Sequence, residues 1–192
     1  MAYILIVIGA LLIIVGGIML FNKSKLPQET PQHQKAKPTF DENKAKGDAF
    51  ESFIVKQFNK KYFTLQEWRG DKYVDGNYPV SNHFPDLEVS FELKDTKDHF
   101  AIECKWRKDY FKGAIDWAED YQLNNYKEYA QKTKLPVFVV IGVGGEPANP
   151  KELFIIPLKE IQFMSLYKKT LEPYRKEVGT NLYWDNENKM LR

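Results

Sequence analysis

The sequence predicts an α/β domain with a mixed β-sheet flanked by helices, preceded by one N-terminal transmembrane helix. Three features indicate this: a charge-free apolar run at residues 2–21, alternating apolar and polar residues at 86–93 and 99–107, and a continuous apolar run at 136–143. Alternation is typical of a strand with one buried face, and a short continuous run is typical of a strand covered on both faces. The 192 residues suffice for one ordinary domain plus an appendage.

The apolar run at residues 2–21 is long enough to cross a membrane, since about 20 helical residues span a hydrocarbon core of roughly 30 Å. A cleaved signal peptide would have a basic segment before the run and an A-x-A-like cleavage site, and neither is present. Lys23 and Lys25 follow the run, so the positive-inside rule places the rest of the chain in the cytoplasm. We therefore expect residues 1–21 to be a single-pass anchor in the inner (cytoplasmic) membrane.

Residues 22–39 are rich in Pro, Gln and Lys and predict a flexible basic tether, which leaves residues 40–192 as the folded domain. The tether holds four lysines and one glutamate, so of the chain's net charge of +2 the domain carries −1. A domain that is not globally basic can bind nucleic acid only through a local patch. The single cysteine, Cys104, excludes an internal disulfide.

The remaining elements follow in order along the domain. Apolar spacing predicts a helix within residues 42–60 that begins near Lys44, and the two alternating segments predict an antiparallel hairpin with a polar turn at 94–98. We then expect a helix at 114–132, a buried strand at 136–143, a strand at 153–156 and a short helix at 158–168. Residues 181–184 are interpreted as an edge strand or a packed tail.

Acidic and basic residues meet on this predicted hairpin. Asp86 begins the first strand, and Glu103 and Lys105 share one face of the second. Two carboxylates and a backbone carbonyl suit Mg²⁺, and a lysine beside them can offset charge on a phosphate, which indicates phosphodiester hydrolysis. The E-x-K pattern also begins at Glu42, Glu92 and Glu187, so a solvated strand face explains the pattern alone equally well.

In this context Asp86, Glu103 and Lys105 resemble the signature of the PD-(D/E)xK nuclease superfamily, which has the restriction-endonuclease-like fold. The segment 47–51, ending in Glu51, is similar to the superfamily's first motif. Residues 122–126 match the Q-x-x-x-Y element of its RecB-like members. Together these motifs cover residues 47–126 and occur in the order that the superfamily has.

The resemblance implies a role for each matching residue. Asp86 and Glu103 would bind Mg²⁺ or Mn²⁺ together with the backbone carbonyl of Cys104, and Glu51 would bind or support the metal. Lys105 would assist the attacking water. The helical pair that would hold substrate or order the site is Gln122 and Tyr126.

The resemblance also implies the partners of the chain. DNA is the expected substrate, a homodimer is compatible with the anchor, and no small-molecule cofactor is expected. Beyond the second strand, residues 106–112 mix cations such as Arg107 and Lys108 with aromatic rings. Such a segment either grips phosphates and stacks on bases or is a solvated strand end.

Other functions remain open at this stage. The same fold could serve as a non-catalytic module that binds nucleic acid or protein at the membrane, and the domain charge of −1 agrees with a protein partner. An envelope-assembly protein with an unrelated α/β fold is a third interpretation. His83, close to Asp86, is either a substrate contact or a loop histidine without a role.

Overall fold

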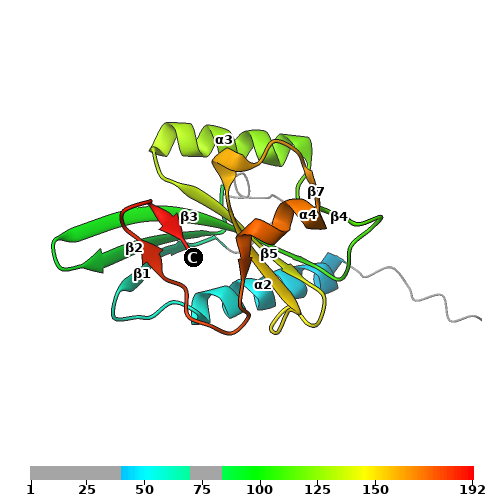
Figure 1. The fold of residues 1–192 in the computed structure, drawn as a ribbon, viewed down its shortest axis with the longest axis horizontal. Coiled ribbons are helices and arrows are strands. Elements are labelled where there is room, and N and C mark those ends of the chain that lie inside the picture. The colour runs from blue at the N-terminus through cyan, green and yellow to red at the C-terminus, as the bar shows by residue number, and fades with distance from the viewer. Residues whose placement is uncertain (1–39, 70–83) are drawn as a thin grey trace, which may run out of the picture. The chain divides into compact units, whose positions relative to one another are not determined.

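A computed structural model describes residues 40–69 and 84–192 (Figure 1). The predicted anchor, the predicted tether and His83 lie outside the described residues. Within the described part, no helix has the length and apolar character that crossing a membrane requires. Element labels follow Figure 1.

The first half of the domain contains two helices and four strands. The elements are α2 (Phe40–Lys56), β1 (Phe63–Trp68), β2 (Leu87–Leu93), β3 (Thr96–Arg107), β4 (Ala114–Asp116) and α3 (Asp120–Thr133). The second half continues the sheet and ends in short elements. These are β5 (Val137–Val143), β6 (Glu152–Pro157), η2 (Leu158–Glu160), β7 (Ser165–Tyr167), α4 (Lys168–Leu171), η3 (Glu172–Tyr174), β8 (Arg175–Lys176), β9 (Trp184–Asp185) and β10 (Met190–Leu191).

Six strands form one mixed sheet in the order β1-β2-β3-β5-β6-β8. All neighbouring pairs are antiparallel except β3 and β5, which run parallel. A parallel pair needs a long crossover, and α3 provides it. The predicted α/β class with a mixed sheet is confirmed.

Helices cover both faces of the sheet: α2 lies on one side and α3 on the other (Figure 1). The α2 face buries an aromatic cluster that includes Phe50, Phe100 and Phe138. The α3 face buries a second cluster built from β5, β6 and α3, including Leu123 and Tyr126. The continuous apolar run of β5 is buried at every residue, as a central strand requires.

The middle of β3, residues 100–104, is also buried on both faces, which differs from the half-exposed strand that its alternation suggests. Phe100, Ile102 and Cys104 face the α2 cluster, and Ala101 faces the α3 cluster. Glu103 lies on the α3 side and is only 1% exposed. A solvated strand face therefore does not explain the E-x-K pattern at this position.

The structure differs from the sequence predictions at four places. The helix predicted from residue 114 begins at Asp120, because residues 114–116 form β4 and pair with β7. The helix predicted at 158–168 is a 3₁₀ turn followed by β7. Strand β1 was not predicted, and the turn of the hairpin holds only Lys94 and Asp95, with Lys94 at φ 54°.

The C-terminal segment is a packed tail, one of the two predicted alternatives. The Trp184 ring stacks on Phe100 with centroids 4.7 Å apart and planes 4° apart. The Trp184 indole N–H donates to an Asp98 carboxylate oxygen at 2.8 Å. The tail thus closes the α2-face core and takes no part in the site described next.

Candidate active site

The two predicted carboxylates sit beside each other at the start of the hairpin. The register pairs Leu87 with Ile102, so one further step places Asp86 opposite Glu103. Asp86 Oδ2 accepts a hydrogen bond from the Cys104 backbone N–H at 2.7 Å. The N–H and C=O of a strand residue point to the same side of the strand, so the Cys104 carbonyl also faces Asp86.

The two oxygens of the Glu103 carboxylate differ in their contacts. Oε1 accepts a hydrogen bond from the Tyr126 hydroxyl at 2.7 Å and forms an ion pair with Lys105. Among the described residues, Oε2 is the buried side-chain oxygen that has no hydrogen-bond partner. A buried acceptor without a partner costs about 1–3 kcal/mol, so it indicates a ligand position.

Lys105 lies next to both carboxylates and keeps some access to solvent, with a side chain 19% exposed. Burial lowers the pKa of Lys105, but the Glu103 and Asp86 carboxylates outweigh burial and raise this pKa above its ordinary value. The ammonium group therefore stays protonated at neutral pH. It can donate to an anion but does not act as a base.

Glu51 reaches the same site from α2. Its carboxylate accepts a hydrogen bond from the Trp68 indole N–H at 2.6 Å, and it is 8% exposed. Burial raises the pKa of Glu51 to about 7, against the Trp68 hydrogen bond, which lowers it. The Asp48 and Glu103 carboxylates contribute to this rise, and Lys105 opposes it.

The acidic side chains repel one another at this point. Burial raises the pKa of Asp86 well above its ordinary value, and the Glu103 carboxylate adds to the shift. A cation would relieve this repulsion and would give Glu103 Oε2 a partner. No three His, Cys, Asp or Glu side chains within residues 40–69 and 84–192 form a ready cation cage. The groups that could bind a divalent ion are therefore the Asp86 and Glu103 carboxylates and the Cys104 carbonyl, with Glu51 nearby.

The thiol of Cys104 points away from these groups into the α2-face core. Burial raises its pKa well above the ordinary value, and the Asp86 carboxylate acts in the same direction. A thiol kept neutral and buried is a poor nucleophile. Its backbone, and not its side chain, belongs to the site.

The predicted substrate contacts are distributed unevenly. Tyr126 is in the site, whereas Gln122 turns back at the start of α3, where its Oε1 accepts from the Glu119 backbone N–H at 2.9 Å. Arg107 donates from its three nitrogens to the backbone carbonyls of Trp106, Asp116 and Trp117, at 2.8–3.1 Å. Lys108 is exposed.

Arg69 contributes to the site although the sequence patterns did not point to it. Its backbone N–H donates to the Asp86 carbonyl at 2.7 Å, and its Nη1 donates to the Pro85 carbonyl at 3.0 Å. Its Nη2 forms an ion pair with Glu88, which also accepts the Tyr129 hydroxyl. Arg69 thereby fixes the start of β2, where Asp86 lies. A prediction of β1 would have placed Arg69 beside this segment.

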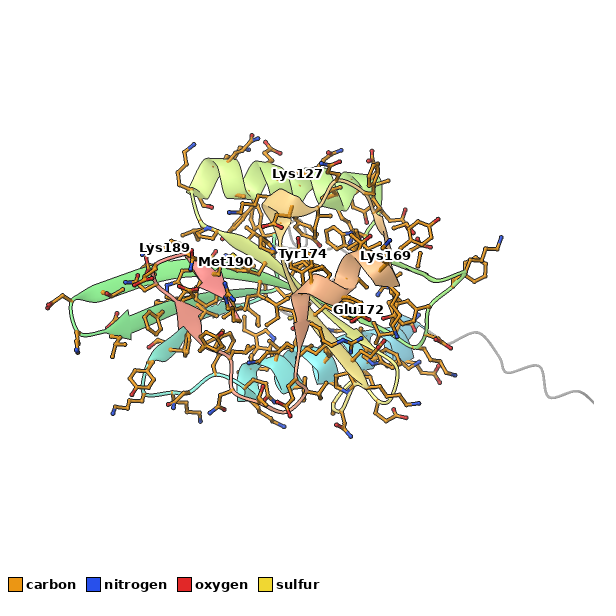
Figure 2. The ribbon with its side chains drawn as sticks, viewed as in Figure 1. Lys127, Lys169, Glu172, Tyr174, Lys189 and Met190 are labelled. Carbon is orange, nitrogen blue, oxygen red and sulfur yellow. The ribbon has the colours of Figure 1, made fainter. Side chains whose placement is uncertain are left out.

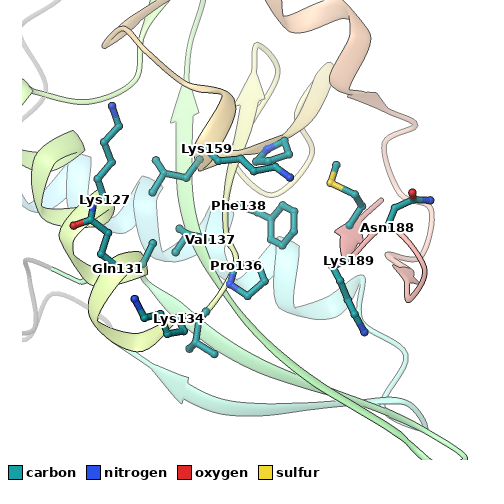
Figure 3. Close-up of a pocket in the computed structure, with 14 residues that line it drawn as sticks. Lys127, Gln131, Lys134, Pro136, Val137, Phe138, Lys159, Asn188 and Lys189 are labelled. Atoms are coloured by element: carbon teal, nitrogen blue, oxygen red, sulfur yellow. The ribbon is translucent and has the colours of Figure 1, made fainter.

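Two cavities lie near α3, and different residues line each of them. One of about 350 Å³ touches the Arg69, Glu88 and Tyr129 network. The other, of about 540 Å³, is the lysine groove, whose lining includes four lysines and no carboxylate (Figure 3). These are Lys127, Lys134, Lys159 and Lys189. Figure 2 shows that Lys127 comes from α3 and Lys189 from the C-terminal tail. Within the described chain, Lys189 alone of the four has an ion-pair partner, Asp98.

Comparison with known proteins finds similarity among solved structures. No protein-family model matches this chain, and no curated protein matches it. Among solved structures, the chain is similar to Hjc of Archaeoglobus fulgidus, a Holliday junction resolvase from an archaeal hyperthermophile. The two are 16% identical, with a TM-score of 0.45, and the alignment covers 69% of this chain and 92% of Hjc.

Proposed function

We propose that this chain is a metal-dependent nuclease of the PD-(D/E)xK type that hydrolyses phosphodiester bonds of DNA. One observation carries the proposal: Glu103 is buried beside Asp86 and Lys105, and its Oε2 has no hydrogen-bond partner. A protein that only binds DNA gains nothing from two carboxylates facing a phosphate. A hydrolase needs them to hold a cation.

Asp86, Glu103 and the Cys104 carbonyl would hold a divalent ion, Mg²⁺ or Mn²⁺, and Glu51 would complete or support the set. The ion, when bound, would polarise the phosphate and lower the pKa of a bound water. The hard oxygen donors suit these ions better than softer metals.

Lys105 supplies the positive charge that the protein itself brings to the reaction. Its protonated ammonium lies against Glu103 Oε1 and beside Asp86. From there it donates to the attacking water or to the oxygen on which negative charge develops. Tyr126 holds Glu103 Oε1 from the other side, so the carboxylate keeps one orientation.

The predicted anchor and tether would place this activity at the cytoplasmic face of the inner membrane. The proposal rests on the charge-free run at residues 2–21 and on Lys23 and Lys25 after it. Membrane association of the full-length chain, and its release by truncation before residue 40, would test this part separately.

The activity is tested with the full-length chain on linear and circular DNA, single- and double-stranded, with Mg²⁺ or Mn²⁺. Asp86→Ala and Lys105→Ala are expected to abolish cleavage. The matched control is Lys97→Ala, also on β3, whose side chain is 62% exposed and paired with Glu92. Cleavage of circles would identify an endonuclease. A folded chain that cleaves nothing and binds no metal would instead support the non-catalytic module.

A further inference from the structure

Two segments that pair at the end of β3 form a small structure that we call the strap, residues 106–118 and 163–169. Within it, β4 pairs with β7, and the two lie side by side in Figure 1. Ala114 pairs with Tyr167 on one side and exchanges two backbone hydrogen bonds with Phe111 on the other. The strap is therefore an ordered element, not a loose strand end.

Arg107 attaches the strap to β3, the strand that carries Glu103 and Lys105. Arg107 follows Lys105 by two residues on β3, so both side chains lie on the same face. Its guanidinium donates to the carbonyls of Asp116 at 2.8 Å and Trp117 at 3.1 Å. The side chain predicted to touch substrate instead holds the strap in place.

A second connection runs through the active-site tyrosine. Trp117 is fully buried and stacks on Tyr126, with ring centroids 6.2 Å apart. Tyr126 in turn donates to Glu103. The Trp117 indole N–H donates to the Phe163 carbonyl at 3.1 Å, which ties the other segment of the strap to the same point. The strap is thus fixed relative to the candidate catalytic carboxylate.

Two aromatic rings of the strap are left open to solvent. Phe111 is 70% exposed and Tyr167 is 63% exposed. Both residues pair with Ala114, and directly paired residues of antiparallel strands point to one face. The two rings therefore flank a small side chain on the same face of the strap.

The charge of the strap matches an anionic partner. It carries three lysines or arginines at positions 107, 108 and 112 and two lysines at 168 and 169, against Asp109 and Asp116. This gives a formal charge of +3 within a domain whose total is −1. Arg107 is bound to backbone carbonyls and Lys168 is paired with Glu152, so among the described residues Lys108, Lys112 and Lys169 are the strap cations without an ion-pair partner. The Lys112 ammonium lies 5.4 Å from the Phe111 ring centroid, so cation and aromatic ring are presented together.

We propose that the strap is a stacking platform for unpaired nucleotides of the DNA strand that enters the active site. The inference rests on the proposed nuclease function and narrows its substrate class to single-stranded or branched DNA. Exposed aromatic faces stack on bases that are not enclosed in a duplex, and nearby cations hold the backbone. Arg107 is a positioning residue in this arrangement.

The test measures binding of the full-length chain to single-stranded and duplex oligonucleotides that contain 2-aminopurine. EDTA is present, so that binding does not depend on catalysis. Phe111→Ala and Tyr167→Ala are each expected to weaken single-strand binding about fivefold or more and to reduce quenching of the 2-aminopurine fluorescence. Phe111→Tyr keeps an aromatic ring and is expected to retain both single-strand binding and fluorescence quenching. The control is Tyr183→Ala, an aromatic residue of the C-terminal tail that is 53% exposed.

Unchanged single-strand binding in both alanine variants would overturn the inference. Equal losses on single-stranded and duplex DNA would also overturn it. Loss in Lys134→Gln or Lys159→Gln, with Phe111→Ala unaffected, would assign binding to the lysine groove of Figure 3 and likewise overturn it. A chain that binds unpaired DNA through these rings but cleaves nothing would support the stacking platform and contradict the proposed nuclease activity.

Discussion

At the scale of single residues, Glu103 links Tyr126 and Lys105 within the candidate site. Its Oε1 is shared by Tyr126 and Lys105, and its Oε2 is left for a further ligand. A carboxylate held on one side by a tyrosine and a lysine cannot rotate without losing both contacts. This fixed orientation suits an oxygen that has to meet a metal ion at one position.

Removing the tyrosine hydroxyl is expected to weaken the fold as well as the site. Tyr126→Phe leaves Glu103 Oε1 with Lys105 alone and loses a hydrogen bond to a charged group, which contributes about 1.5–3 kcal/mol. Urea unfolding measures the loss. Tyr121→Phe, on the same helix and 60% exposed, is expected to change stability by less than about 0.5 kcal/mol. Equal stability of the two variants would show that the contact contributes nothing.

The raised pKa of Glu51 predicts a pH dependence of stability in metal-free protein. Its pKa is about 7 in the fold and 4.5 unfolded, so between these values the unfolded chain has released a proton that the native chain keeps. Stability therefore falls as pH rises from about 4.5 to 7, by at most roughly 3 kcal/mol for this group.

Glu51→Gln tests this expectation by urea unfolding across that pH range. The variant should lose less stability than the wild type as pH rises. Some dependence should remain, because the pKa of Asp86 is also raised and acts with the same sign. Superimposable pH profiles of variant and wild type would contradict the assigned burial of Glu51.

At the scale of elements, the approach of α2 to β5 depends on a glycine. A Cβ at Gly142 would lie 2.4 Å from Phe50 Cε2, inside a fully buried cluster. Gly142→Ala is therefore expected to destabilise the protein by about 1–3 kcal/mol or more. Gly47→Ala, on α2 with no atom within 4 Å, is the control and should be neutral or stabilising by up to about 1 kcal/mol. Thermal unfolding of both variants measures the difference, and an equal response would contradict the packing.

The hairpin could be predicted because its residues carry a local signal. Alternation from Leu87 to Leu93 and from Phe100 to Trp106 set the faces, and the faces placed Asp86, Glu103 and Lys105 together. The continuous apolar run of β5 was equally clear. These elements form the centre of the sheet, where burial is most complete and the hydrophobic pattern strongest.

The elements that could not be predicted depend on contacts distant in sequence. Five of the six residues of β1 are exposed, so it shows little hydrophobic pattern, and pairing with β2 makes it a strand. Residues 114–116 belong to the segment 114–132, whose apolar spacing predicts a helix, but their pairing with β7 makes them a strand. Arg107 looks like a phosphate contact in sequence, but its three carbonyl acceptors are visible only in the fold. Arg69 was missed together with β1.

At the scale of the whole molecule, metal binding is expected to stabilise the native state. An ion held by Asp86 and Glu103 binds only when β2 and β3 are paired, so it raises stability by about 2.7 kcal/mol at 100 times its dissociation constant. Thermal unfolding with increasing Mn²⁺ should show a rising midpoint. Asp86→Asn keeps an oxygen that can accept the Cys104 N–H but removes a charge, and should abolish the rise. An undiminished rise in this variant would place the metal elsewhere.

The whole domain combines a pair of carboxylates, the buried Glu103 and the partly buried Asp86, with a strap attached to β3. The proposed function assigns hydrolysis to the carboxylate pair, and the further inference assigns recognition of unpaired DNA to the strap. The domain's net charge of −1 fits this division, since cations concentrated on the strap replace a generally basic surface.

The most direct test compares Mg²⁺-dependent DNA hydrolysis by wild type and by Glu103→Gln. Glutamine keeps the shape of the side chain and an oxygen for Tyr126 and Lys105, but it removes the charge that would hold a cation. We expect the rate to fall by about 100-fold or more while the protein remains folded. Hydrolysis at the wild-type rate by a folded Glu103→Gln variant would contradict the assignment of Glu103 to the catalytic centre.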